Sequence, residues 1–311
     1  MRIVYSDKYA IDIGAHVFPV TKYDRIRSLL AGMPIWEELE FVEPVECRWE
    51  DIGLVHSRDY IAKLRAGRLS ISEQAEMELP WSSDVVEGFS LMVGGTITAA
   101  RLAFDARGGA PAAGLVVHLG GGFHHAFPDH GEGFCMFNDV AVAVRVLARD
   151  AGLERVAVID CDVHHGNGTA AIFADDPGVF TFSIHQRYNY PAVKPRSSLD
   201  VALVDGVSDV EYLRALTTAL PRVFDFQPQL VFYLAGADPF EDDQLGGLSL
   251  TLDGLRKRDR VVLEAIDAAR VPGVVTLAGG YARHGEDTVA AHAATVEEVL
   301  AIVRRARSTV R

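Results

Sequence analysis

Apolar positions along this chain follow two alternating patterns. Short runs rich in valine, isoleucine and leucine indicate strands, and longer stretches with apolar residues at every third or fourth position indicate helices. The expected strands span residues 2–5, 115–119, 155–159, 179–184, 229–234 and 273–277. The expected helices span residues 139–149, 209–224, 252–269 and 287–306, and a further helix begins near Ser83 or Asp84. This alternation predicts an α/β fold with helices on both faces of a mainly parallel sheet.

No repeat, low-complexity tract or linker divides the sequence, so we expect one domain that spans residues 1–311. The segment 71–81, with the sequence ISEQAEMELPW, shows neither period and is expected to be irregular. We interpret its acidic residues as solvated surface groups, with a place at the rim of a substrate site as the alternative.

Polar residues gather directly after the five later strands. The sequences at these points are GGGFHHAF, DCDVHHGNG, HQRYNYP, AGAD and AGGY. In open parallel sheets, ligands bind outside the carboxyl ends of the strands. Five polar strand ends at one edge therefore predict a single functional site.

A metal site is predicted from the sequence DCDVH. Along an extended segment, Asp162 and His164 point to the same side, with Asp160 behind them. A carboxylate and an imidazole suit Zn²⁺ or Fe²⁺. A catalytic zinc takes three protein ligands and keeps a place for water, so the third ligand must come from another strand end. Asp238, in AGAD, is the best candidate.

Two further strand ends carry candidate catalytic groups. His124 and His125 follow three glycines and suit metal binding or proton transfer near neutral pH, although structural histidines are an alternative. Tyr281 follows two glycines, and its phenol can donate a hydrogen bond to a developing oxyanion or simply pack over a loop.

Composition restricts the partners and the compartment. The net charge of −13 argues against nucleic acid as the main partner, since phosphate binding needs clustered basic residues. Cys47, Cys135 and Cys161 form no CxxC pair and are interpreted as reduced thiols. We find no signal pattern in MRIVYSDKYAID and no uninterrupted apolar run of ~18 residues. We therefore expect a cytoplasmic protein without membrane insertion; the sequence does not determine its oligomeric state.

Four segments resemble the histone deacetylase superfamily, which includes acetoin-utilisation and acetylpolyamine deacetylases. They are GGGFHHAFPDHGEGFCMFND, VIDCDVHHGNGTAAIF, YLAGADPFEDDQLGGLSLT and LAGGY. The GNG triplet and the stretch DQLGGLSLT…LRKRD look most like the class IV branch and its bacterial relatives. The resemblance covers nearly the whole chain. It implies a three-layer αβα arginase/deacetylase-like fold with a mainly parallel sheet of about eight strands.

The resemblance also implies roles for individual residues. The zinc ligands would be Asp162, His164 and Asp238. The groups that act on the substrate or hold those that do would be His124, His125, Tyr281, Asp160 and Asn167. Many members have aspartate where this chain has Asn167, and an amide supports a positive charge less well, so His125 is expected to be less basic here.

The resemblance further implies a substrate tunnel and a monovalent-cation site. The tunnel would be formed by Gly133, Phe134, Tyr190 and Leu245. The K⁺ or Na⁺ site, built largely from backbone carbonyls, would be formed by Asp160, Asp162, His164, Ser183 and Ile184. A second such site would lie near Phe173, Asp176 and Val179. We find no clear equivalent of the rim aspartate that clamps the substrate backbone in other branches.

The predicted function is zinc-dependent hydrolysis of Nε-acyl-lysine in a protein or peptide, with an acetyl or longer acyl group. The class IV resemblance raises the possibility of long acyl chains. A deacylase of acetylpolyamines or related small amines is the main alternative. A dimanganese ureohydrolase is disfavoured because Gly166 stands where its DxHxD pattern needs a carboxylate. An inactive binding module is disfavoured because every principal chemical position is filled.

Overall fold

The computed structural model describes residues 1–108 and 114–309. Its centre is one sheet of eight strands in the order β2-β1-β3-β8-β7-β4-β5-β6, and neighbouring strands are parallel throughout. The strands are β1 (Arg2–Val4), β2 (Glu40–Val42), β3 (Leu115–His118), β4 (Val156–Asp160), β5 (Val179–Gln186), β6 (Leu199–Leu203), β7 (Leu230–Leu234) and β8 (Gly273–Thr276). The predicted α/β class with a parallel sheet of about eight strands is confirmed.

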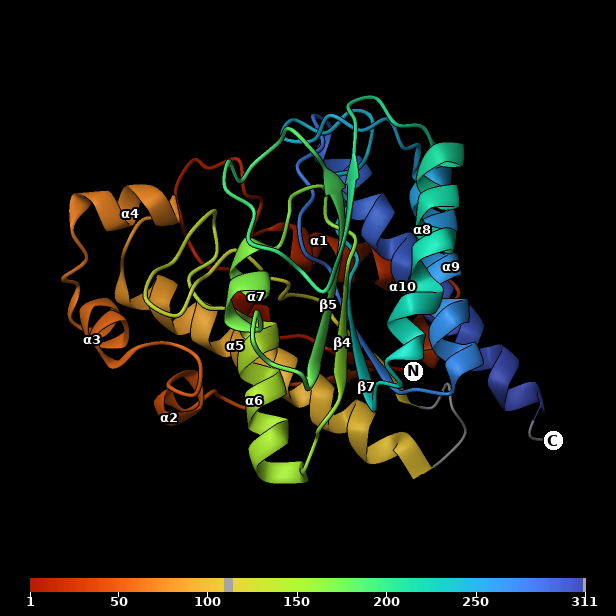
Figure 1. Cartoon of the computed structure of the whole chain (residues 1–311), viewed down its shortest axis with the longest axis horizontal. Coiled ribbons are helices and arrows are strands. Elements are labelled where there is room, and N and C mark those ends of the chain that lie inside the picture. Colours follow the sequence, from red (N-terminus) through yellow and green to blue (C-terminus); the bar gives the residue numbers. More distant parts are fainter. Residues whose placement is uncertain (109–113, 310–311) are drawn as a thin grey trace.

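Helices cover both faces of the sheet and make the three layers (Figure 1). The helices are α1 (Lys22–Ala31), α2 (Trp49–Ile52), α3 (Arg58–Ala66), α4 (Ile71–Met77), α5 (Ser83–Asp105), α6 (Asp139–Ala151), α7 (Asn167–Ile172), α8 (Asp209–Asp225), α9 (Leu252–Ala269) and α10 (Gly285–Thr309). Helices α5, α6 and α7 lie on one side of the sheet, and α8, α9 and α10 lie on the other. Short 3₁₀ helices span Asp7–Tyr9, Trp36–Glu38 and Ala106–Gly108.

The central strands explain why the sequence pattern was informative. Every residue of β3, β4, β7 and β8 is buried, because helices cover both faces, and such strands are almost continuously apolar. The two edge strands, β2 and β6, were not predicted. They are only partly buried, so their sequences EFV and LDVAL carry no continuous apolar run.

The expectation that segment 71–81 is irregular is wrong for its first seven residues, which form α4. Ser70 caps this helix, since its Oγ accepts from the Glu73 amide at 3.2 Å and Glu73 Oε2 accepts from the Ser70 amide at 2.7 Å. This reciprocal arrangement is a capping box, which stabilises the first turn. The spacing S-x-x-E was visible in the sequence and would have predicted the helix.

Helix α5 is the most apolar long helix in the described parts of the chain. By length and composition it would suit a membrane span, but 72% of its most apolar 18-residue window is buried within the protein. It contacts α6 and strands β1, β3 and β8. In this structure α5 is therefore a core helix.

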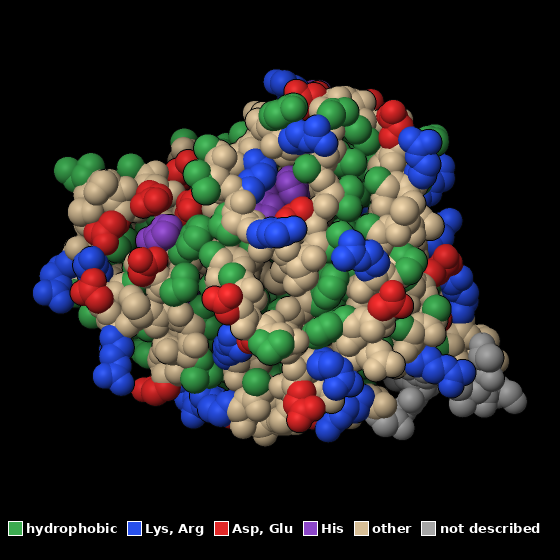
Figure 2. Space-filling view, viewed as in Figure 1, with side chains coloured by type: hydrophobic (Ala, Val, Ile, Leu, Met, Phe, Trp, Pro, Cys, Tyr) green, Lys and Arg blue, Asp and Glu red, His purple; other side chains and the backbone are tan. Residues whose placement is uncertain are grey.

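Because the strands are parallel, they all end at one edge of the sheet, the upper edge in Figure 1. On the face shown in Figure 2, histidine side chains lie in a hollow near this edge, with Lys and Arg side chains around it. Because the strands all end at this edge, the polar clusters that follow them come from separate parts of the chain to the same edge.

Candidate active site

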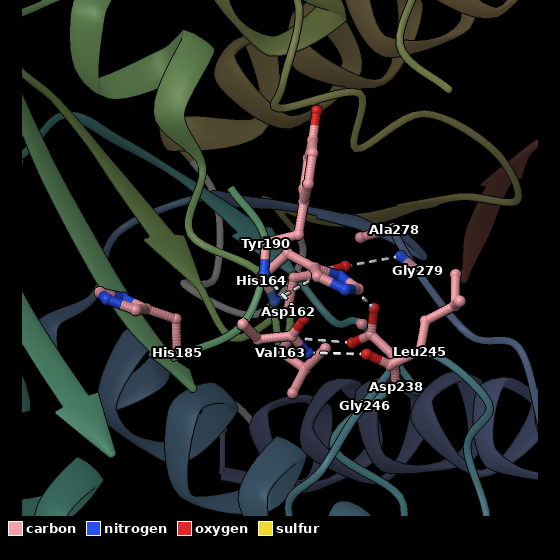
Figure 3. Close-up of polar contacts among 12 residues, drawn as sticks. Asp162, Val163, His164, His185, Tyr190, Asp238, Leu245, Gly246, Ala278 and Gly279 are labelled. Carbon is pink, nitrogen blue, oxygen red and sulfur yellow. Dashed lines mark hydrogen bonds and ion pairs between the residues drawn. The ribbon is translucent and has the colours of Figure 1, made fainter. Parts of the chain in front are cut away.

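Three side chains with metal-binding atoms converge at this edge. Asp162 and His164 follow β4, and Asp238 follows β7, the strand beside it. Each is buried, and one ligand atom from each lies within 4.8 Å of the others. His164 Nδ1 lies 3.1 Å from Asp162 Oδ1 and 3.3 Å from Asp238 Oδ2 (Figure 3). The structure thus brings together the three residues that were predicted from the sequence as metal ligands.

Backbone amides fix the two carboxylates in place. Asp162 Oδ2 accepts from the Gly279 amide at 2.8 Å, and Asp238 Oδ1 accepts from the Val163 amide at 2.8 Å. Asp238 Oδ2 is buried and has no hydrogen-bond partner. A buried carboxylate oxygen without a donor is costly, and a divalent cation would satisfy it. The set of one nitrogen and two oxygen donors therefore fits a divalent ion such as zinc.

The charges of this group point the same way. Burial and the neighbouring Asp162 carboxylate raise the pKa of Asp238. Burial acts to lower the pKa of His164, but the neighbouring Asp162 and Asp238 carboxylates outweigh it and raise the pKa to about 10. The pocket therefore favours a positive charge, which a bound cation supplies together with the ligand bonds.

The tandem histidines lie next to this group, each with its own partner. His124 Nδ1 donates to Asp160 Oδ2 at 2.7 Å, and His125 Nδ1 donates to Asn167 Oδ1 at 2.6 Å. Their Nε2 atoms are 3.0 Å apart. Glycines 121 and 122, at φ values of 69° and 81°, allow the preceding loop to turn into the site.

The two imidazoles have different electrostatic surroundings. Burial acts to lower the pKa of His124, but the charges of Asp160 and Asp162 raise it to about 9. Burial, then the charges of His124 and His164, lower the pKa of His125 well below its usual value. At neutral pH this leaves His125 neutral beside a charged neighbour, a separation typical of an acid–base pair.

Tyr281 lies opposite the histidines, at the end of β8. Its ring centroid is 6.5 Å from that of His164 and 5.9 Å from that of Phe134. Its amide donates to Asp243 Oδ2 at 2.6 Å, and Asp243 Oδ1 accepts from the Leu245 amide at 2.8 Å. Asp243 thus holds both Tyr281, the candidate catalytic tyrosine, and the loop that carries Leu245. No pattern in the sequence distinguishes Asp243 from its neighbours.

A cavity of about 170 Å³ leads to these groups. Its walls include all four residues of the predicted tunnel. The lining residues are Glu78, His125, Gly133, Phe134, His164, Asn189, Tyr190, Leu245 and Tyr281. Beyond them lies a narrower space of about 20 Å³, bordered by Phe18, Tyr23, Phe123 and Cys135 as well as the site residues.

The residues proposed for monovalent cations lie at the same edge. Asp160 pairs with Ser183 in the β4–β5 register, and Ile184 is the next residue of β5. Asp162 and His164 follow β4, where the Val163 carbonyl accepts from the Gln186 amide at 2.9 Å. Near the second predicted site, the Asp176 carboxylate forms an ion pair with Arg145 and accepts from the Gly178 amide at 2.8 Å. The Phe173 carbonyl there accepts from the Asp176 amide, and the Asp176 carbonyl accepts from the Val179 amide.

Three more residues near the site escaped the sequence analysis. Lys22 is buried and donates to the Ala278 carbonyl at 2.6 Å; burial lowers its pKa to about 8, against the attraction of Asp238. Glu78 lines the cavity and belongs to the acidic segment for which a place at the rim of the site was the alternative. Glu132 contacts Asn167 and Tyr190. Lys22 and Glu132 read in the sequence as ordinary surface charges, so no signal distinguished them.

Comparisons with known proteins agree with this geometry. A model of the histone deacetylase domain matches residues 16–297, a range that includes every site residue above. An uncharacterized protein of Picosynechococcus sp. is 39% identical over 292 residues, which cover 93% of this chain and 95% of that protein. Histone deacetylase 2 of Arabidopsis thaliana is 32% identical, over 93% of this chain and 77% of its own length. The acetoin utilization protein AcuC of Bacillus subtilis is 32% identical, over 74% of this chain and 62% of its own length.

Proposed function

Since this chain belongs to the histone deacetylase family and is a hydrolase of the deacetylase type, we propose that it uses zinc to hydrolyse the amide bond of Nε-acyl-lysine. The observation that carries this proposal is the buried group of Asp162, His164 and Asp238, with the unpartnered Asp238 Oδ2, at the foot of an open cavity. Ferrous iron suits the same donors.

The ion would supply Lewis acidity at the acyl carbonyl and lower the pKa of the attacking water. His125 is neutral, and its Nε2 atom contacts the Nε2 atom of His124. This Nε2 accepts a proton as the water attacks. His124, held by Asp160, carries the proton that the leaving amine requires. The Tyr281 hydroxyl donates to the developing oxyanion, a role supported by its position across from His164.

The size of the site favours a short acyl group. The space beyond the tunnel is about 20 Å³, against about 170 Å³ for the tunnel cavity itself. It suits the methyl of an acetyl group, whereas each added methylene would require the walls at Phe18, Tyr23 or Phe123 to move. We therefore propose acetyl-lysine as the better substrate, although the class IV resemblance raised long acyl chains.

A substrate panel tests this proposal. Zinc-loaded protein is incubated with lysine peptides that carry acetyl, hexanoyl or myristoyl groups and with acetylated polyamines, and amine release is measured. We expect kcat/KM to be highest for acetyl-lysine peptide and to fall with acyl length. A preference for myristoyl-lysine would overturn the short-acyl proposal, and a preference for polyamines would overturn the lysine substrate. If no substrate of the panel is hydrolysed in a reaction that a chelator stops, the proposed function is overturned.

A further inference from the structure

We propose that Glu132 is a positioning residue of this site, which holds the side chains of Asn167 and Tyr190 with one carboxylate oxygen. Glu132 Oε1 accepts from Asn167 Nδ2 at 2.8 Å and from the Tyr190 hydroxyl at 2.7 Å. The proposal rests on the proposed function, because Asn167 supports His125 and Tyr190 forms the tunnel wall.

The backbone places Glu132 firmly. It lies between β3 and α6, and the Glu132 amide donates to the Cys135 carbonyl at 3.1 Å while the Cys135 amide donates back at 2.9 Å. Gly133 and Phe134, both of which line the cavity, are the two residues inside this turn. The side chain of Glu132 is only 14% exposed. The turn that shapes the tunnel therefore also presents the carboxylate to Asn167.

The carboxylate determines how the Asn167 amide is turned. The neighbouring His130 and the hydrogen bonds from Tyr190 and Asn167 outweigh the effect of burial and lower the pKa of Glu132, so it is ionised and can only accept. Asn167 must then present Nδ2 to Glu132 and Oδ1 to His125. In turn His125 must carry its proton on Nδ1, which leaves Nε2 as the acceptor that the reaction needs.

The negative charge also reaches His125 through the amide. Hydrogen bonds in a chain polarise one another, so an ionised Glu132 makes Asn167 Oδ1 a better acceptor. The protein thus keeps a carboxylate behind His125, with the Asn167 side chain between them. An aspartate at position 167 would place the carboxylate against His125 directly. Tyr190 is tied to the same oxygen, and its ring packs against His125 at 5.0 Å with an interplanar angle of 86°.

Glu132 also belongs to a group of possible metal ligands with Glu76 and His130. Its Oε1, however, already accepts two hydrogen bonds, and Oε2 lies 3.6 Å from His130 Nε2. Glu76, by contrast, lies 3.8 Å from His130 and has a 52% exposed side chain. Glu76 is therefore a matched control, a carboxylate beside the same histidine that contacts neither Asn167 nor Tyr190.

An exchange of the amide and the carboxylate tests the proposal. Asn167→Asp alone places two carboxylates face to face, and we expect kcat to fall about 10–100-fold, the usual effect of disturbing a supporting residue. In the exchange variant Asn167→Asp/Glu132→Gln, the amide introduced at position 132 can donate both to the new carboxylate at position 167 and to the Tyr190 oxygen. The chain of hydrogen bonds is then restored in reverse order. We expect kcat to return to within about fivefold of wild type, with KM little changed.

The same variants are unfolded with urea in the zinc-loaded state. We expect the midpoint to fall in Asn167→Asp and to recover in the exchange variant, whereas Glu76→Gln on the Asn167→Asp background recovers neither midpoint nor kcat. An exchange variant no better than Asn167→Asp in both measurements overturns the proposal. Recovery of the midpoint in a protein that hydrolyses no acylated amine supports the contact while the proposed function fails, so the two failures are distinguishable.

Discussion

Two groups of histidine and aspartate lie near the carboxyl ends of the strands, and their structures differ. The first is Asp162, His164 and Asp238; the second is His165, His185 and Asp200. In both, the candidate ligand atoms lie within 4.8 Å of one another. Figure 3 shows His185 well apart from the first group. Close spacing of suitable atoms therefore does not by itself separate a metal centre from a structural cluster.

Hydrogen bonding does separate them. In the second group, His165 Nε2 lies 3.2 Å from Asp200 Oδ1, and Asp200 Oδ2 accepts from the Ser197 amide at 3.0 Å, so both carboxylate oxygens have donors. His165 Nδ1 is buried without a partner, but it is the nitrogen on the other side of the ring from Asp200. In the first group the unpartnered atom is Asp238 Oδ2, which faces the other ligands beneath the cavity. An unsatisfied lone pair that faces the group is what indicates a metal.

The two groups should differ most in how they respond to the loss of one carboxylate. We expect Asp238→Ala to reduce zinc content from about one ion per chain to less than about 0.1, because only two protein ligands remain. Hydrolysis should fall at least about a thousandfold, since the Lewis acid is worth several kcal/mol. Asp200→Ala should keep both zinc and activity. Metal analysis by mass spectrometry on dialysed protein measures this, and loss of zinc from Asp200→Ala would reverse our assignment of the two groups.

Tyr281 sharpens the comparison, because it faces the first group only. We expect Tyr281→Phe to lower kcat about 10²–10³-fold through loss of one oxyanion donor. Zinc content and the thermal unfolding midpoint should remain those of wild type, since the Tyr281 backbone amide still donates to Asp243. A variant that retains most of the wild-type kcat would remove Tyr281 from the mechanism.

The two groups also show what the sequence could predict. Asp162 and His164 were found because period-two spacing after a buried strand puts both on one side, and Asp238 because it ends another such strand. Glu132, Asp243 and Lys22 were not found, since their roles come from contacts between distant segments. Likewise the buried strands were predicted, whereas the half-exposed β2 and β6 were not. Local patterns predict what a single segment does, and contacts between segments require the structure.

The smallest expected effect is on stability, from Asp200→Asn in the second group. Burial acts to raise the pKa of Asp200, but hydrogen bonds from His165 and Ser197 lower it overall. A lowered pKa in the folded state stabilises the fold above the unfolded pKa of about 3.9 and loses this contribution as pH falls through the folded value. The side chain is 29% exposed, so we expect Asp200→Asn to cost only about 1 kcal/mol at pH 7, with the difference from wild type narrowing between about pH 5 and pH 3. Urea unfolding across this range measures the gap. A gap that widened toward acid would mean that Asp200 does not stabilise the fold as a paired carboxylate, and the contrast between a structural group and a metal-binding group would lose its second member.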